Sequence, residues 1–447
     1  MNLKERFPLR ILSVLICACL ATSVVYAQED EERDNQKTKQ AQAVSKEVYD
    51  RIQKAQEEID AGNEREALKI LESLRSRDLT EYELQNVLNY IGFVHYNMEN
   101  IPAAIRVYEE MIRIPSIEPQ IKKQTVYTLA QLSMMQEQYA KALKLLDEYF
   151  VLETNPAPEP YILYAQGLYQ ENRYGDMVRP IETAMDIARK RQTEIKEDWW
   201  VLLNFAYFQQ ENYAKVRDIQ KILLQTWPKK RYWFSLAGAY TELGEEMNLL
   251  TSYDAAHTQG MLEKEAELVT MAQLYMQHEV PYKAATLLEK EMNAGRVSKD
   301  AKNYRLLSQA WTLAAEDEKS IPALQQAARL SDDGELNLRL GNAHLNLGEY
   351  SECVTAIREG LRKGGIKSPD NANISLGMCL YNTRDYREAI AAFREAGKTP
   401  RSRRIANQWI NVIEQDIERI EQIRLAEAAA QRQQRQLAER RRASDRS

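Results

Sequence analysis

Glycine, proline and cysteine are scarce in this chain of 447 residues, which contains 16 glycines, 13 prolines and four cysteines. Alanine, leucine, glutamate, glutamine, lysine and arginine dominate instead, and these side chains lose little rotamer freedom in a helix. The composition therefore predicts an all-α protein. The length fits two or three ordinary domains, or one array whose size is set by its number of repeats.

The chain also lacks an excess of positive charge. Its formal net charge is −6, so its body carries no broad positive field that would collect nucleic acid or anionic lipid. We therefore expect no nucleic-acid partner.

The first 27 residues have the pattern of a signal peptide. Lys4, Arg6 and Arg10 precede an apolar run over residues 11–20, and Val25-Tyr26-Ala27 offers small residues at the two positions that a signal peptidase inspects. We expect cleavage after Ala27 and a location in the periplasm or outside the cell. Lipoprotein processing at Cys19 is the alternative. An uncleaved membrane anchor is less favoured, because the apolar run is shorter than the roughly 20 residues that a membrane span needs.

Only Cys353 and Cys379 remain after that cleavage. Two cysteines make neither a disulfide framework nor a zinc cluster. They lie in consecutive repeats and could meet in a disulfide. The favoured interpretation is two unpaired cysteines that act as small core residues.

Internal self-similarity is the main signal in the sequence. A small residue at the centre of one helix is followed 12 positions later by another small or apolar residue. The ten pairs are Ala55 and Ala67, Gly92 and Ala104, Ala130 and Ala142, Ala165 and Met177, Asn204 and Val216, Ala237 and Leu249, Ala272 and Ala284, Ser308 and Ser320, Gly341 and Cys353, and Gly377 and Ala389. Two antiparallel helices approach closely only where both side chains are small, so the interval predicts ten helical hairpins in one register.

These repeats resemble the tetratricopeptide-repeat (TPR) family over residues 44–400. The resemblance implies a right-handed superhelical solenoid of about ten helix-turn-helix repeats, with a concave groove that holds peptides or proteins.

Four stretches are also similar to periplasmic TPR proteins that accompany the TonB, ExbB and ExbD energy-coupling components. They are AQLYMQHEVPYKAA (residues 272–285), WTLAAEDEKSIP (311–322), LSDDGEL (330–336) and RSRRIANQWI (401–410). This narrower resemblance implies a role beside TonB-dependent uptake, with components of that system as partners.

The two ends of the chain differ from the array. Residues 28–44 are acidic and polar without apolar periodicity, which predicts disorder. Residues 401–425 carry apolar residues at helical spacing and are expected to form a capping helix over the last repeat. Residues 426–447 form a basic tail with Arg432, Arg435, Arg440, Arg441 and Arg442. This tail is either a solvated helix or an arm that meets an acidic partner or membrane headgroups.

The sequence contains no recognisable catalytic, metal or cofactor motif, and we expect no enzyme activity. His95 and His344 occupy a repeat position that holds Tyr or Trp in other units, which favours packed core histidines. His278-Glu279 begins like a zinc-protease helix, but Tyr282 stands where the second histidine is needed.

The concave wall of such an array is lined by the first helix of each repeat. Positions three before and one, four and five after the small residue share a face at 3.6 residues per turn. The predicted groove residues are Asn89, Phe93, Asn97, Tyr127, Gln131, Met134, Gln166, Tyr169, Gln170, Phe205, Gln209, Gln273, Gln277, Gln309, Asn342, Asn346, Tyr381 and Asn382.

Amides, aromatics and a methionine make up this set, with almost no lysine or arginine nearby. Amides can pair with the backbone of an extended peptide, and rings can cover its apolar side chains. The set therefore predicts a scaffold for an extended, weakly charged protein segment. Two alternatives remain: the amides are ordinary solvated surface, or the protein is an envelope assembly factor that acts through its outer surface and basic tail.

Overall fold

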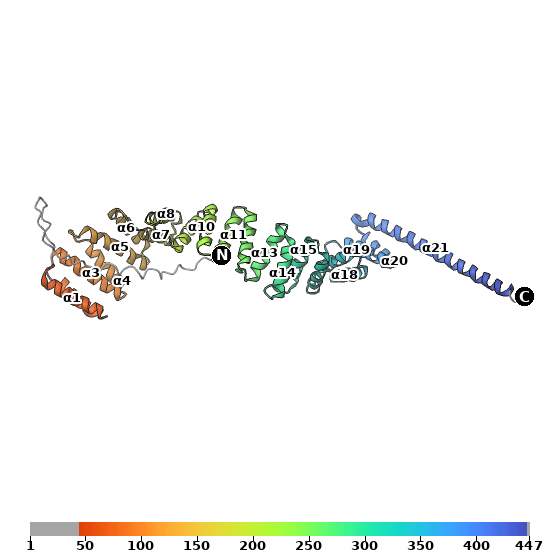
Figure 1. Cartoon of the computed structure of the whole chain (residues 1–447), viewed down its shortest axis with the longest axis horizontal. Coiled ribbons are helices and arrows are strands. Elements are labelled where there is room, and N and C mark those ends of the chain that lie inside the picture. The colour runs from red at the N-terminus through yellow and green to blue at the C-terminus, as the bar shows by residue number, and fades with distance from the viewer. Residues whose placement is uncertain (1–43, 445–447) are drawn as a thin grey trace. The chain divides into compact units, whose positions relative to one another are not determined.

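The computed structural model describes residues 44–444, and all regular structure among them is helical. The predicted leader and nearly all of the acidic segment lie outside these residues. The chain divides into two compact units, with the boundary in the sequence between Thr154 and Asn155. Figure 1 shows the helices coloured along the chain.

The first unit contains three helical hairpins. They are α1 (Lys46–Asp60) with α2 (Glu64–Arg75), α3 (Glu81–Asn97) with α4 (Ile101–Met111), and α5 (Pro119–Met135) with α6 (Tyr139–Leu152). Their apolar faces enclose one core, in which Leu71, Leu88, Ile91 and Leu129 are fully buried.

The second unit contains seven hairpins and a final long helix. The hairpins are α7 (Pro158–Gln170) with η2 (Tyr174–Met177) and α8 (Val178–Lys190), α9 (Glu197–Gln209) with α10 (Tyr213–Thr226), α11 (Lys230–Glu242) with α12 (Glu246–Thr258), α13 (Glu265–Gln277) with α14 (Pro281–Asn293), α15 (Ala301–Leu313) with α16 (Asp317–Arg329), α17 (Gly334–Asn346) with α18 (Tyr350–Lys363), and α19 (Pro369–Asn382) with α20 (Tyr386–Ala396). The last helix is α21 (Pro400–Ser444). Ten hairpins confirm the all-α repeat fold and the number of repeats that the sequence predicts.

Every hairpin turn has the same backbone geometry, and this explains the fixed interval of 12. The residue seven positions after each small residue adopts a positive φ. These residues are Gly62, Glu99, Glu137, Asn172, Glu211, Gly244, Glu279, Ala315, Gly348 and Arg384. The next amide donates a hydrogen bond back across the turn, as from Asn100 to the His95 carbonyl at 2.9 Å. This pattern is the Schellman helix end, and its repetition holds the two helices of each hairpin in one register.

The small residues face the second helix of their own hairpin, as the interval predicts. A Cβ atom added to Gly92 would come within 2.6 Å of the Tyr108 ring, and one added to Gly377 within 2.7 Å of the Phe393 ring. Because Tyr108 and Phe393 lie four residues after the second small residue of their repeats, a large side chain on one helix fills the gap that glycine leaves on the other.

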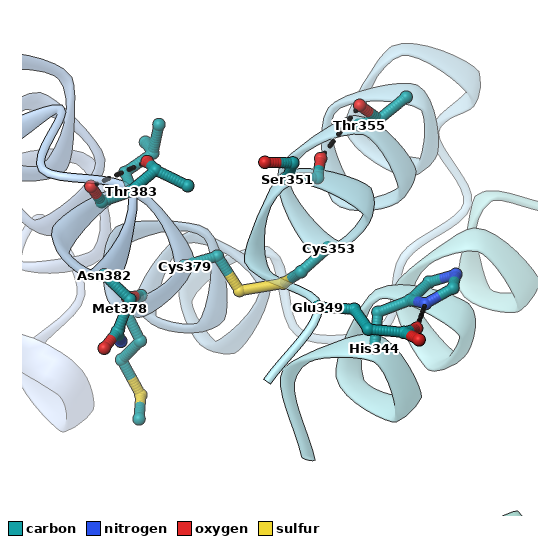
Figure 2. Close-up of a disulfide and its surroundings, with 10 residues drawn as sticks. His344, Glu349, Ser351, Cys353, Thr355, Met378, Cys379, Asn382 and Thr383 are labelled. Carbon is teal, nitrogen blue, oxygen red and sulfur yellow. Dashed lines mark hydrogen bonds and ion pairs between the residues drawn. A yellow bond between two sulfur atoms is a disulfide. The ribbon is translucent and has the colours of Figure 1, made fainter. Parts of the chain in front are cut away.

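Cys353 and Cys379 form a disulfide, which corrects the favoured prediction of two unpaired cysteines. Figure 2 shows the bond between α18 and α19. Cys353 is the small residue of the second helix in its hairpin, and Cys379 lies on the face of the next hairpin that packs against it. Their Cα atoms are 6.2 Å apart, within the range that a disulfide spans. Spacing in the sequence could not show that the two side chains point toward each other.

Helix α21 is one continuous helix across the expected boundary between the capping helix and the basic tail. Its first turns pack on the last hairpin: Ala406 and Ile413 are fully buried, and the Trp409 ring stacks on Phe393. From Glu414 to Ala438 almost every side chain is exposed. Over residues 44–444, no helix combines the length and the apolar character that crossing a membrane requires.

Candidate binding surface

The predicted groove residues lie on one face of the first helix of each repeat, here called the first-helix face. Two backbone features place them there. The turn seven residues after the small residue fixes where each first helix ends, and the small residue itself faces the second helix of its own hairpin. The side chain at position +1 therefore points away from the hairpin core.

Most of the predicted residues are accessible on this face. Asn89, Asn97, Gln166, Gln209, Gln273, Gln277, Asn346 and Asn382 are exposed. The half-buried residues are Phe93, Tyr127, Gln131, Tyr169, Gln170, Phe205, Gln309, Asn342 and Tyr381. Met134 is buried, with 5% of its surface exposed. Met134 is therefore not part of the accessible surface, and its inclusion in the predicted groove is wrong. Its position on α5 faces the neighbouring helices.

The Tyr381 side chain is already in contact with helix α21 of the same chain. Its hydroxyl donates a hydrogen bond of 2.6 Å to Asp416 of α21, and its ring lies 5.6 Å from that of Trp409. The bond to Asp416 raises the pKa of the Tyr381 hydroxyl. Helix α21 thus covers this end of the first-helix face, which the sequence prediction left open.

The amide side chains on the second unit have free hydrogen-bonding groups. Within the described part of the chain, Gln166, Gln273, Gln309 and Asn342 form no side-chain hydrogen bond with another residue. All four hold the same repeat position, on α7, α13, α15 and α17. An amide presents two donors and an acceptor with two lone pairs, so this row can pair with the backbone of an extended segment.

An aromatic cluster borders the amide row on α7, η2 and α9. The Phe205 ring centroid lies 5.0 Å from that of Tyr169 and 5.2 Å from that of Tyr174, and both contacts are edge to face. Phe208, one turn further on, is 46% exposed. Rings held in this way present a rigid apolar surface that loses little entropy when a ligand side chain packs on it.

Two cations at the start of α11 are paired with carboxylates from neighbouring helices. Arg231 of α11 contacts Glu197 of α9 at 2.6 Å, and Lys230 contacts Glu267 of α13 at 2.9 Å. Burial alone would raise the pKa of the Glu197 carboxyl, but hydrogen bonds from Lys229, Tyr232 and Arg231 lower it. These ion pairs are not apparent in the sequence, because the two residues of each pair lie more than 30 positions apart. Only the stacking of hairpins brings them together.

A cleft of about 380 Å³ between α14, α15 and α16 was also missed by the sequence analysis. Trp311, Tyr304 and Met292 line its apolar part, and Glu289 and Lys319 lie at its edge. The Trp311 side chain is 2% exposed, so little of its ring reaches the cleft surface. The amino group of Lys319 lies 4.8 Å from the centre of the Trp311 ring.

Two histidines have side chains that are buried or half-buried within the repeats. His344 is 4% exposed, and its Nδ1 lies 2.6 Å from a carboxylate oxygen of Glu349 (Figure 2). His95 is half-buried, and burial lowers the pKa of its imidazole. No group of three or more potential metal ligands occurs among the residues that the structure describes.

Comparison with known proteins finds similar folds only. No family model and no curated protein matches the chain. Among solved structures, MamA is 19% identical over 38% of this chain and 90% of its own, with a TM-score of 0.32. A tetratricopeptide-repeat protein from Parabacteroides merdae is 13% identical over 64% of this chain and 94% of its own, with a TM-score of 0.36.

YrrB, described as a TPR protein with an unusual peptide-binding site, is 16% identical over 42% of this chain and 95% of its own. Its TM-score is 0.34. Two of these three structures are described as TPR proteins, and a likeness at this level carries no conclusion about a ligand.

Proposed function

We propose that this protein is a non-catalytic scaffold that holds an extended, weakly charged segment of another protein along the first-helix face. The unpaired amide row on α7, α13, α15 and α17 is the observation that carries the proposal. An extended segment brings one backbone donor and one acceptor per residue. Amides satisfy both kinds of group, which a row of lysines would not do.

The charge around the surface supports an uncharged ligand. Lys230 and Arg231 are already paired with carboxylates, so they offer no free site for an acidic tail. The cluster of Tyr169, Tyr174 and Phe205 supplies apolar contact beside the amides. We therefore expect apolar and small polar side chains in the bound segment.

We further propose that the scaffold works in the cell envelope, in the periplasm, and supports TonB-dependent uptake. The leader pattern and the resemblance of four stretches to TonB-associated TPR proteins motivate this proposal. The disulfide between Cys353 and Cys379 supports an oxidising compartment, where such bonds persist. Fractionation of cells that express the full chain tests the location, and a reduced protein in the cytoplasm would contradict it.

Site-specific photo-crosslinking tests the binding surface. A photoreactive residue in place of Gln273 should capture a defined segment in the native envelope. The same residue at Gln325, an exposed position on the second helix α16, should not. Mass spectrometry identifies the captured segment, and recovery of TonB-system components would support the narrower proposal.

A synthetic peptide of the captured segment then measures affinity. Replacing Gln166, Gln273, Gln309 and Asn342 by alanine should weaken binding by about tenfold or more, because each lost hydrogen bond contributes about 1 kcal/mol. Stability should stay within about 0.5 kcal/mol per substitution, since the side chains form no internal bonds. Equal affinity of the variant and the original protein would refute the proposal.

A second function is favoured by the exposed distal part of α21. An assembly factor could use this helix and its basic end to sit on an envelope complex. Deleting residues 426–447 distinguishes the two functions. Loss of partner capture on deletion favours the assembly factor, whereas loss only in the amide variant favours the scaffold.

A further inference from the structure

The start of helix α21 has one face that contacts the last hairpin. Four residues of α21 form this contact. Ala406 and Ile413 are fully buried, the Trp409 ring stacks on Phe393, and Asp416 accepts the hydrogen bond from Tyr381. These four residues alternate at intervals of three and four. That spacing is the one by which helices pack side by side at a shallow angle.

The same spacing continues beyond the hairpin, where the face has lost its partner. The positions that follow are Ile420, Ile423, Glu427, Ala430, Gln434 and Leu437. Ile420, Ile423 and Leu437 are 44%, 52% and 50% exposed. Figure 1 shows this part of α21 extending past α20 of the same unit. We call residues 417–438 the distal segment of α21.

Charge divides α21 beyond Ile413 into an acidic half, residues 414–427, and a basic half that begins at Arg432. In the acidic half both arginines are already paired, because Arg419 binds Asp416 at 2.9 Å and Arg424 binds Glu421 at 2.7 Å. Glu414, Glu418 and Glu427 therefore have no arginine partner within the described residues. In the basic half, Arg432 and Arg435 form no ion pair within the described residues. The sequence continues with Glu439 and then with Arg440, Arg441 and Arg442, so this half remains net positive.

Only one arrangement of two such helices brings opposite charges together. In a parallel pair the acidic halves would lie side by side and repel. In an antiparallel pair the acidic half of each helix lies along the basic half of the other. The alanines at 426 and 428–430 fall near the middle, where small side chains allow a close approach.

We propose that the distal segment of α21 pairs antiparallel with the same segment of a second copy of this chain. The register that places Ile420 beside Leu437 of the partner copy also places Glu427 beside Ala430. An anionic membrane fits less well, because the acidic half would face it. The dimer carries two first-helix faces, so it would bind a repeated or dimeric ligand by avidity.

Sedimentation equilibrium of the purified protein tests the pairing. We expect a dimer at about 50 mM salt that dissociates as screening increases with salt concentration. Ile423→Asp should raise the dissociation constant about tenfold or more, since it places a charge in the apolar contact. Leu425→Asp is the matched control: Leu425 is also 52% exposed but lies on the opposite side of the helix.

Cysteine crosslinking tests the orientation. A protein with Ile420→Cys should crosslink to one with Leu437→Cys when the two are mixed under oxidation, and neither should crosslink efficiently to itself. The native disulfide is fully buried and should not exchange. Self-crosslinking of Ile420→Cys would overturn the antiparallel arrangement.

Two other results would overturn the pairing itself. One is a monomer at all concentrations up to about 100 μM at low salt, well above the range of specific dimers. The other is a monomer that binds vesicles of phosphatidylglycerol and phosphatidylcholine through Ile423, which would assign the segment to a lipid surface. Neither result bears on the amide row, so failure here is distinguishable from failure of the proposed scaffold.

Discussion

The last hairpin and the distal segment of α21 are neighbours in the chain, and both are helical, but different forces hold them. In the hairpin, Phe393 is fully buried between Gly377 and Trp409. In the distal segment, almost all side chains face solvent. There the helix depends on alanine, glutamine and arginine, which favour helix locally, and on pairs such as Glu421 with Arg424.

This difference indicates which positions tolerate substitution without loss of the fold. A hairpin position is constrained by its partner helix and by the next hairpin, because stability in a repeat array is a sum over neighbours. A distal position has no packed neighbour within the same chain, so in a single copy only helix propensity constrains it. Four experiments test how strongly packing constrains each part of the chain.

Removing the largest core side chain of the last hairpin should have the largest effect. We expect Phe393→Ala to lower the free energy of unfolding by about 3–5 kcal/mol, through the cavity it leaves and the lost stacking on Trp409. Leu425→Ala, at an exposed distal position outside the proposed pairing face, should change it by less than about 0.5 kcal/mol. Urea unfolding followed by circular dichroism measures both. Similar losses in the two variants would contradict the distinction.

The disulfide should contribute the next largest effect. Replacing both Cys353 and Cys379 by alanine should cost about 3 kcal/mol, because the bond restricts the unfolded chain over a separation of 26 residues. Reductant should destabilise the original protein similarly and leave the double variant unchanged. If reductant destabilised both proteins equally, the effect would lie elsewhere.

The common turn predicts a pair of opposite changes. Gly348→Ala should destabilise by about 1 kcal/mol, because its φ of 77° is unfavourable for any side chain. Ala315→Gly, at the equivalent position with φ of 57°, should gain a similar amount. Thermal unfolding of the two variants measures the shifts. Shifts of equal sign would show that the turns are not equivalent.

Acid should selectively weaken the start of α3. Hydrogen bonds from Ser45 and Thr80 hold the pKa of the buried Glu83 carboxyl at about 2, below its usual 4.5. A lowered folded-state pKa stabilises the fold above pH 4.5, and this contribution disappears as the pH falls toward 2. Glu83→Gln should therefore flatten the loss of stability over this range. Thr80→Ala should cost about 1 kcal/mol near neutral pH through the lost cap. An unchanged pH profile in Glu83→Gln would contradict this role.

The candidate surface could be predicted only in part. Helical periodicity places Gln166 and Gln273 on one exposed face, and the structure shows both exposed. It does not reveal that Met134 turns inward or that α21 covers Tyr381. Those outcomes depend on which neighbour packs over each turn, and periodicity within one helix carries no information about its neighbours.

The sequence by itself determined the repeat: an interval of 12 between small residues is enough to specify ten hairpins, because close helix approach needs small side chains at matching heights. The disulfide between Cys353 and Cys379 and the ion pair between Glu197 and Arg231 became visible only in the folded protein. The same holds for the exposed apolar residues of α21 beyond the last hairpin. Each of these depends on the distance between atoms of different helices, which packing sets and local spacing does not.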